Sequence, residues 1–457
     1  MLAALGGAQS RTFAPAIIAL TISAVLIRPA VATGRSRALD VALLCCLAWT
    51  VLQAVPLPPG WREILSPNAG AIDRALRFDG NVLRPRPLSI DPQSTLRAAI
   101  VTAMAAAMFW IARELCARQG TRRLVQAVAW SGLTFSVIAL LARAYSPDLI
   151  YGFWNPGALS PPYGPFVNRN HMGTWLVMAL PLVMGYIFAR FDDRARRGSF
   201  AAAIDTRMVW LMGAAGMMFV AIIGSLSRSA AIGTLSSGMF VGALAGTRRS
   251  RGWWGVLATA AVFVLILVAI PRSVDLGLRF EDSQASRTST AWARAQIWRE
   301  TLPIVHDFPL TGTGAGSFRT AMLVYQQSDR RLFFNQAHNQ YLQFAAEGGL
   351  ILIVPLICAA VLFAHAAARR LSQDRTPMVW IRIGAAAGIV GVLVQSIWET
   401  GLRLPANGLL FAALCAIVIY EDDAHPPHVD PASRGCGMNT LNRTSRPRSA
   451  GDPPRPL

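Results

Sequence analysis

The segment NQAHNQYLQFAAEGG contains a histidine that is suited to proton transfer. Histidine is the side chain that best matches acid–base chemistry near neutral pH. The spacing places His338 on one helix face with Tyr341, and the helix should break after Glu347 at a pair of glycines. A lone histidine is more often structural, but Asn339, Tyr341 and Glu347 follow it closely. We therefore predict that His338 is catalytic and that these three neighbours bind substrate.

Two arginines could bind an anion through their planar guanidinium groups. Arg228 lies in the SLSRS hinge between two apolar runs, where it must pair or snorkel toward water. Arg294 lies beside an apolar stripe that predicts an amphipathic helix, on the membrane surface or against the bundle. The stripe consists of Ala291, Ala295, Trp298, Leu302 and Val305. At both positions two interpretations remain open: an ordinary surface arginine, or an arginine that binds a diphosphate.

A further polar cluster stands where the loop GPFVNRNH enters an apolar run. Asn168 alone could be a helix N-cap, because asparagine satisfies free backbone N–H groups well. Arg169, Asn170 and His171 follow it directly, and the four together exceed what capping requires. We predict that this cluster binds substrate.

The sequence contains no motif for a metal or a nucleotide cofactor. HExxH and CxxC are absent, and the six cysteines form no disulfide or metal pattern. The glycines of LTGTGAGSF lack the preceding strand of a dinucleotide site, so a turn with close backbone approach is expected instead. We therefore expect chemistry that needs neither metal nor cofactor.

The composition indicates a membrane protein. Of the 457 residues, 53% are hydrophobic and only 15% are charged, with a mean hydropathy of +0.41. A soluble protein of this size would need more charge to cover its surface. All 43 basic residues are arginine and the net charge is +19. Because these arginines sit in short clusters between apolar runs, they indicate membrane topology rather than nucleic-acid binding.

About eleven apolar runs could each cross a bilayer, so we predict an all-α polytopic membrane protein with about 10–12 transmembrane helices. The runs are approximately 12–27, 38–55, 95–112, 124–142, 171–189, 208–225, 229–246, 253–270, 350–368, 380–397 and 405–420. Five arginine clusters fall on one side, which the positive-inside rule makes cytoplasmic.

The two long loops, about 56–94 and 271–349, then fall together on the opposite face, the second as a helical loop between the eighth and ninth spans. The side on which the N-terminus lies stays open. We expect residues 1–420 to form one membrane domain. The Pro- and Arg-rich residues 421–457 should form a disordered cytoplasmic tail.

Four segments in order resemble the O-antigen ligase and polysaccharide polymerase family of bacterial inner membranes. They are FVNRNHMGTWLVMALPL, SLSRS, RAQIW with PLTGTGAGSF, and AHNQYLQFAAEGG. The resemblance covers roughly residues 40–420, with SRSAA in place of the commoner SRG pattern. It implies a multi-pass glycosyltransferase of the GT-C type, which takes a glycan from undecaprenyl diphosphate at the periplasmic face. The family needs no metal, and we expect inversion at the anomeric carbon.

The resemblance also implies roles for individual residues. His338 matches the family histidine proposed as the general base for the acceptor hydroxyl. Arg228 and Arg294 match the arginines thought to hold the leaving diphosphate. Residues 168–171 match an NxNH-like segment with a structural or substrate-positioning role. Glu399, in SIWETGL, is a looser match and the last candidate.

The sequence does not identify the acceptor of the glycan. Lipid A core would define an O-antigen ligase, a growing glycan a polymerase, and a protein side chain an oligosaccharyltransferase; we slightly favour a ligase or an exopolysaccharide polymerase. The expected partners are thus a lipid-linked glycan donor, one of these acceptors and the lipid bilayer, without nucleic acid. The alternative from another class is a transporter or an assembly protein of polysaccharide export. Transport would favour acidic residues at mid-bilayer, and few are found.

Overall fold

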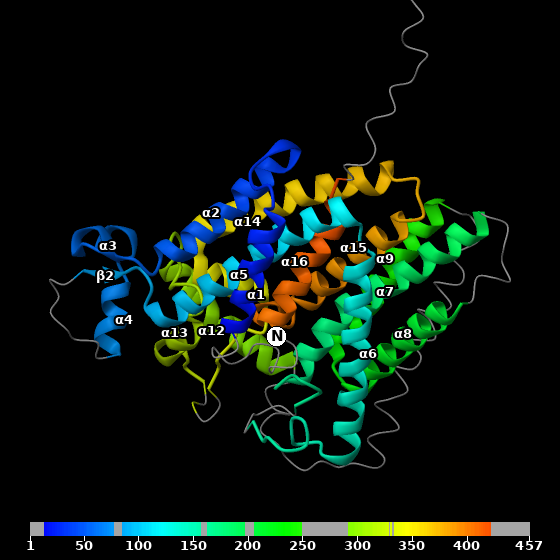
Figure 1. Ribbon diagram of the computed structural model, residues 1–457. Helices are drawn as coiled ribbons and strands as arrows, with labels where there is room; N and C mark the ends of the chain where they lie inside the picture. Colours follow the sequence, from blue (N-terminus) through cyan, green and yellow to red (C-terminus); the bar gives the residue numbers. More distant parts are fainter. Residues whose placement is uncertain are drawn as a thin grey trace, which may run out of the picture. The chain divides into compact units, whose positions relative to one another are not determined.

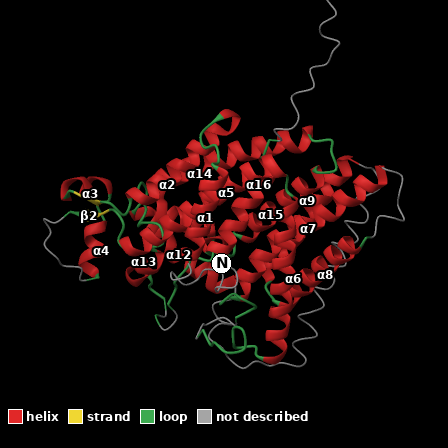
Figure 2. Cartoon of the chain, in the orientation of Figure 1, coloured by secondary structure: helices red, strands yellow, loops and turns green. Residues whose placement is uncertain are grey.

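The computed structural model describes residues 13–76, 85–156, 162–196, 205–248, 291–328, 330 and 333–421. The expected span at 253–270, the first part of the long loop and the polar tail from residue 422 lie outside these residues. Within them the chain is mostly helical, with one short hairpin (Figure 1, Figure 2).

The long helices are α1 (Phe13–Ile27), α2 (Arg37–Leu52), α5 (Pro92–Gln119), α6 (Arg122–Tyr145), α7 (Arg169–Arg196), α8 (Thr206–Gly224), α9 (Arg228–Arg248), α14 (Gln340–Gln373), α15 (Val379–Gln395) and α16 (Pro405–Ile419). Shorter elements are α3 (Pro59–Leu65), α4 (Ala69–Ala75), α12 (Ala291–Asp307), α13 (Phe318–Tyr325) and the 3-10 turns η3 (Gly34–Ser36) and η5 (Gly401–Arg403). Strand β1 (Pro56–Leu57) pairs antiparallel with β2 (Arg86–Pro87).

Six of these helices, α5 to α9 and α14, are long and apolar enough to cross a membrane. Three further apolar helices, α1, α15 and α16, are shorter. Every expected span that falls within the described residues overlaps a helix. The protein is therefore a helical membrane protein, whereas the total of about eleven spans stays a prediction.

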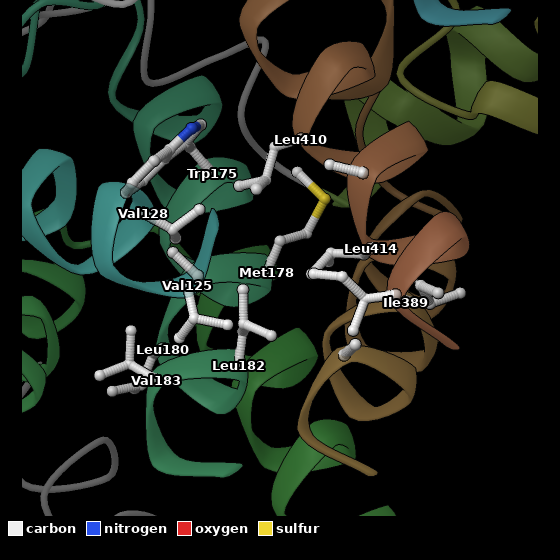
Figure 3. Close-up of a cluster of buried hydrophobic side chains, with 14 of the residues drawn as sticks. Val125, Val128, Trp175, Met178, Leu180, Leu182, Val183, Ile389, Leu410 and Leu414 are labelled. Atoms are coloured by element: carbon white, nitrogen blue, oxygen red, sulfur yellow. The ribbon is translucent and has the colours of Figure 1, made fainter. Parts of the chain in front are cut away.

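Helices α7 and α15 form the centre of the bundle and pack backbone to backbone. A Cβ atom on Gly185 would lie 2.3 Å from the carbonyl oxygen of Trp380, and one on Gly384 would lie 2.3 Å from that of Pro181. Glycine is therefore required on both helices at this crossing. Side chains from α6 and α16, and from further helices, extend the buried apolar cluster around this crossing (Figure 3). Its labelled members are Val125, Val128, Trp175, Met178, Leu180, Leu182, Val183, Ile389, Leu410 and Leu414.

A second, smaller apolar core lies beside α4, α12, α13 and the start of α14. In α12 the buried side chains include Ile297, Thr301 and Ile304, whereas Leu302 is 57% exposed. The face of α12 that is buried inside the protein is therefore centred on Ile297 and Ile304, and not on the expected stripe. The sequence of α12 carries apolar residues on two adjoining faces, and contact with α13 and α14 selects the face that contains Ile297 and Ile304.

Ion pairs fix the helix ends where the arginine clusters lie. Arg113, near the end of α5, binds the buried Asp40 of α2 with both terminal nitrogens at 2.8 Å. Arg190 and Arg194, near the end of α7, contact Asp205 before α8 at 2.6 and 2.7 Å. We call this end of the bundle the paired end.

Arg382 near the start of α15 is buried at the paired end too. It contacts Asp374 at 3.1 Å and donates to the carbonyl oxygens of Val418 and Tyr420 at 2.9 and 3.1 Å. Its guanidinium also stacks on the ring of Tyr420, 3.9 Å from the ring centroid. The side chain thus closes the last turn of α16, whose carbonyl groups have no partner within the helix.

Candidate active site

His338 and Glu399 meet at the opposite end of the bundle. Nδ1 of His338 lies 3.6 Å from Oε1 of Glu399, which is an ion-pair distance. The His338 side chain is 24% exposed and that of Glu399 only 1%, so a ligand can reach the ring but not the carboxylate. A charged carboxylate favours the imidazole tautomer with its proton on Nδ1, which leaves the Nε2 lone pair free to accept a proton.

Two hydrogen bonds hold the segments that carry this pair. Thr400 Oγ1 donates to Gln336 Oε1 at 2.5 Å, and the backbone N–H of Gln340 donates to the carbonyl oxygen of Ser396 at 2.9 Å. His338 itself has a φ of 47°, which is unusual for a residue with a side chain. The surrounding bonds therefore maintain a strained backbone where the imidazole must be aimed.

His171 and Arg294 lie close enough for their charges to act on Glu399. Burial by itself would raise the pKa of Glu399. Interaction with His338 and the charges of His171 and Arg294 outweighs burial, and the pKa falls to about 2. Glu399 is therefore a carboxylate at any physiological pH. We call His171, Arg294, His338 and Glu399 the histidine–carboxylate cluster.

Several polar atoms of this cluster lack partners among the described residues. His338 Nδ1, Glu399 Oε2 and Arg294 Nε are buried and form no hydrogen bond there. Nearly all buried polar groups in proteins are hydrogen-bonded, and exceptions often mark functional sites. The cluster therefore has the unsatisfied polar groups that are common at functional sites.

Three arginines form a second cluster at the outer ends of α6, α7 and α9. The charges of Arg143 and Arg228 both act on Arg169, which is half-buried. Arg143 donates to the carbonyl oxygen of Gly224 at 2.7 Å. Within the described part of the chain none of the three forms a salt bridge with a carboxylate. We call them the outer arginine group; their charge favours an anionic ligand.

The first turn of α7 joins the two clusters. Arg169 belongs to the outer arginine group and His171 to the histidine–carboxylate cluster, two residues further on. The turn is closely packed, because a Cβ atom on Gly173 would lie 2.7 Å from Ala230 of α9. Asn407 of α16 donates its side-chain N–H to the carbonyl oxygen of His171 at 3.1 Å.

The carboxylate of Glu347 is bound by the protein itself. Its oxygens accept the backbone N–H groups of Gly316 and Phe318 at 2.8 and 3.2 Å, and Arg403 of η5 lies 3.2 Å away. Gly312 has a φ of 63°, and a Cβ atom there would lie 2.3 Å from the carbonyl oxygen of Glu347. The predicted turn with close backbone approach is thus confirmed. Glu347 holds this turn against α14.

The asparagines predicted to bind substrate include two helix caps. Asn168 Oδ1 accepts the N–H of Asn170 at 2.8 Å ahead of α7, which confirms the capping interpretation. Asn339 Oδ1 accepts the N–H groups of Tyr341 and Leu342 at 3.1 and 3.0 Å at the start of α14.

Two expectations about α14, one on its start and one on its break, have different outcomes. The helix begins at Gln340, so His338 precedes it and does not share its face, contrary to the sequence prediction. Tyr341 donates its hydroxyl to the carbonyl oxygen of Leu393, at 2.7 Å, and so ties α14 to α15. The predicted break is confirmed, because Gly349 has non-helical angles, a φ of 61° and a ψ of −171°.

The structure therefore brings together Arg294, His338, His171 and Glu399, and groups Arg228 with Arg169. Sequence reasoning missed Arg143, Gln336 and Thr400. Arg143 is a single arginine at the end of an apolar run, and the other two are ordinary polar residues in loops. No local signal marks them, because their importance comes from contacts with distant segments.

The structure defines a class of protein: a helical membrane bundle with a charged site at one end, where some buried polar atoms have no hydrogen-bond partner among the described residues. Residues 213–357 match the family model described as O-antigen ligase. This match supports the resemblance to the O-antigen ligase family that the sequence predicted, and that family is one of glycosyltransferase-type enzymes. The matched segment contains Arg228, Arg294 and His338. No curated protein sequence matches the chain.

Proposed function

We propose that the protein transfers a glycan from undecaprenyl diphosphate to an acceptor hydroxyl at the periplasmic face of the bacterial inner membrane. The observation that carries the proposal is the placement of the solvent-accessible His338 ring against the buried carboxylate of Glu399. This is the arrangement of a general base and the group that orients it. The match of residues 213–357 to the family model described as O-antigen ligase supports the reaction class.

In the proposed reaction, His338 Nε2 takes the proton of the acceptor hydroxyl as the oxygen attacks the anomeric carbon. A new carbon–oxygen bond forms as the bond to the phosphate oxygen breaks, and the electron pair leaves with the lipid diphosphate. Attack from the side opposite the leaving group inverts the anomeric configuration. Glu399 stabilises the imidazolium that results.

Arginines are proposed to stabilise the departing diphosphate. Arg294 belongs to the histidine–carboxylate cluster and Arg228 to the outer arginine group. Guanidinium groups form paired hydrogen bonds with phosphate oxygens and can supply the charge that a metal supplies in other transferases. Asn168, Asn170, Asn339, Tyr341 and Glu347 are then proposed to shape the site around the substrate.

The test is transfer by the purified protein in nanodiscs. The donor is a synthetic undecaprenyl-diphosphate glycan, and lipid A core, a glycan repeat and a Ser/Thr peptide are offered separately as acceptors. Product with one acceptor, lost in His338→Ala, supports the proposal and distinguishes ligase, polymerase and protein glycosylation. Absence of product with all three contradicts it and favours transport or assembly.

A further inference from the structure

Both backbone polar groups of the residue before His338 are bound by side chains. The N–H of Ala337 donates to Gln343 Oε1 at 3.1 Å, and the carbonyl oxygen of Ala337 accepts the indole N–H of Trp298 at 3.0 Å. Ala337 and Gln343 are fully buried, so water cannot replace the bond between them without a change in structure. Two side chains thus fix the backbone that leads into the proposed base.

The direction of the His338 side chain depends on this backbone. The carbonyl group of Ala337 belongs to the peptide bond that joins it to His338, and φ of His338 is the rotation measured from that peptide plane. A φ of 47° costs free energy for a residue with a side chain, and it persists only where the surroundings hold it. The bonds to Ala337 hold the peptide plane and therefore help to maintain this angle.

Trp298 connects the His338 segment to the helix that carries Arg294. Both residues belong to α12, four positions apart, so their side chains leave the helix on the same face. Helix α12 is itself held in the smaller core by Ile297 and Ile304. The indole bond to Ala337 therefore sets the position of the proposed base relative to an arginine proposed to bind the leaving diphosphate.

Gln343 is oriented by a second hydrogen bond. Its Nε2 donates to Glu347 Oε1 at 2.9 Å, and the Glu347 carboxylate binds the backbone N–H groups of Gly316 and Phe318. The amide of Gln343 thus donates to one fixed group and accepts from another, and a rotated side chain would lose both bonds. Gln343 therefore holds Ala337 at a fixed position relative to the glycine turn.

We propose that Trp298 and Gln343 are positioning residues for His338, which fix the peptide group before it so that the imidazole is aimed at the acceptor hydroxyl. The inference rests on the proposed function. Neither side chain is assigned to the reacting atoms, and α12 keeps its own core contacts when the indole bond is lost. Loss of either anchor should therefore lower kcat about 2–10-fold, the factor of one ordinary hydrogen bond, at unchanged donor KM.

Trp298→Phe tests the first anchor, because it keeps an aromatic ring and removes the N–H donor. Trp61→Phe is the matched control, since Trp61 lies on α3 and is 63% exposed. Both variants are measured in nanodiscs with a synthetic undecaprenyl-diphosphate glycan at saturating acceptor. Trp298→Phe should lower kcat and leave donor KM unchanged, and Trp61→Phe should change neither. An unchanged kcat in Trp298→Phe, or a rise in KM that accounts for the whole loss, would overturn the proposal.

Gln343→Met tests the second anchor, because methionine has a similar length and no amide. It should reproduce the kcat loss of Trp298→Phe, with a lower unfolding temperature because the buried Ala337 N–H and one bond to Glu347 are also lost. A lower unfolding temperature with unchanged kcat per folded molecule would show that Gln343 acts on stability alone, and would remove it from the proposal.

Chemical modification separates this proposal from the proposed function. Diethyl pyrocarbonate acylates accessible neutral imidazoles, and peptide-resolved mass spectrometry measures the rate at each histidine without any transfer assay. Releasing the peptide before His338 should raise its rate about 2–10-fold in Trp298→Phe, with His306, which is 88% exposed, as the unchanged reference.

The two readouts give distinguishable failures. A raised modification rate in Trp298→Phe, together with full transfer by His338→Ala, would support the positioning role and contradict the proposed function. Transfer that depends on His338, with kcat and modification rate both unchanged in Trp298→Phe and Gln343→Met, would overturn the positioning role and leave the proposed function standing.

Discussion

The arginines of the paired end and those of the outer arginine group have opposite environments. At the paired end, Arg113 binds Asp40 at 2.8 Å and Arg382 binds Asp374 and two carbonyl groups. At the other end, Arg403 pairs with Glu347 at 3.2 Å, but Arg169 and Arg228 have no carboxylate partner within the described residues. The same residue type therefore serves as scaffold where its charge is satisfied, and as a ligand site where its charge is left for a substrate.

The contrast extends from charge to hydrogen bonding. The buried Asp40 accepts bonds from Arg113, Trp110 and the backbone of Ala32. The buried Glu399 leaves Oε2 without a partner in the described residues. Unsatisfied buried polar groups cost free energy of folding. The end of the bundle that holds the candidate site therefore lowers the stability of the protein, and the ion pairs of the paired end offset this cost.

The largest effect is expected from His338→Ala, which removes the proposed base. Transfer should fall about 10²–10⁴-fold while the protein stays folded, because general-base catalysis contributes about that factor. The measurement is the transfer rate in nanodiscs, together with the surface glycan ladder of a deletion strain at matched protein levels. His306→Ala is the control, since the His306 side chain is 88% exposed. Equal activity in both variants would remove His338 from the mechanism.

Arg113→Ala should have the next largest effect, on stability and not on chemistry. It leaves the buried Asp40 without its countercharge, and losing one partner of a buried pair costs about 3–5 kcal/mol. Thermal unfolding in nanodiscs should show the loss, with transfer per folded molecule retained. Arg118→Ala removes an exposed pair with Glu114 and should cost at most about 0.5 kcal/mol. A transfer defect in Arg113→Ala would break the division between the two ends.

Arg228→Ala should reverse that pattern, with stability retained and transfer reduced about 10–100-fold. This range corresponds to about 1.5–3 kcal/mol for a hydrogen bond to a charged group. Arg196→Ala, which removes a surface pair with Asp192, is the matched control and should leave transfer unchanged. If Arg228→Ala stabilised the protein without slowing transfer, the outer arginine group would have no role in donor binding.

A smaller effect is expected from Thr400→Val, which removes the hydrogen bond to Gln336. The transfer rate should fall about 2–10-fold at unchanged donor KM, because an ordinary hydrogen bond contributes about 0.5–1.5 kcal/mol. Thr400→Ser keeps the hydroxyl and should restore the rate. Failure of serine to restore it would show that the methyl packing matters rather than the bond.

The smallest effect concerns the charge of Glu399 as pH varies. Its folded pKa of about 2 lies below the unfolded value of about 4.3, so its stabilising effect is complete above pH 4.3 and lost as pH falls toward 2. The difference in unfolding temperature between wild type and Glu399→Gln should therefore shrink as pH falls from 4 toward 2. A difference that shrinks fully by pH 4 would show that the pKa of Glu399 is not lowered.

The sequence predicts the helices better than it predicts their contacts. Apolar runs locate α5 to α9 because hydrophobic length is a local property. The face of α12 that is buried inside the protein is not predicted by the sequence, because the choice between its two apolar faces is made by α13 and α14.

The site shows the same division between local and distant information. His338 and Arg294 are found from residue type and neighbouring motifs, but the sequence ranks Glu399 last. Its partner His338 precedes α14 whereas Glu399 follows α15, so no local pattern joins them. The bond of Thr400 to Gln336 and the approach of Arg143 to Arg169 likewise depend on how distant helices pack.

The hydrogen bond from Asn407 to His171 has a consequence for the order in which the protein is made. His171 is near the start of α7, whereas α16 is the last helix of the described chain. During synthesis the earlier helices enter the membrane first, and the segment that carries Glu399 and Asn407 arrives after them. A nascent chain that ends before α16 therefore lacks both the carboxylate and this contact, and the site becomes complete only as synthesis of the helical domain finishes.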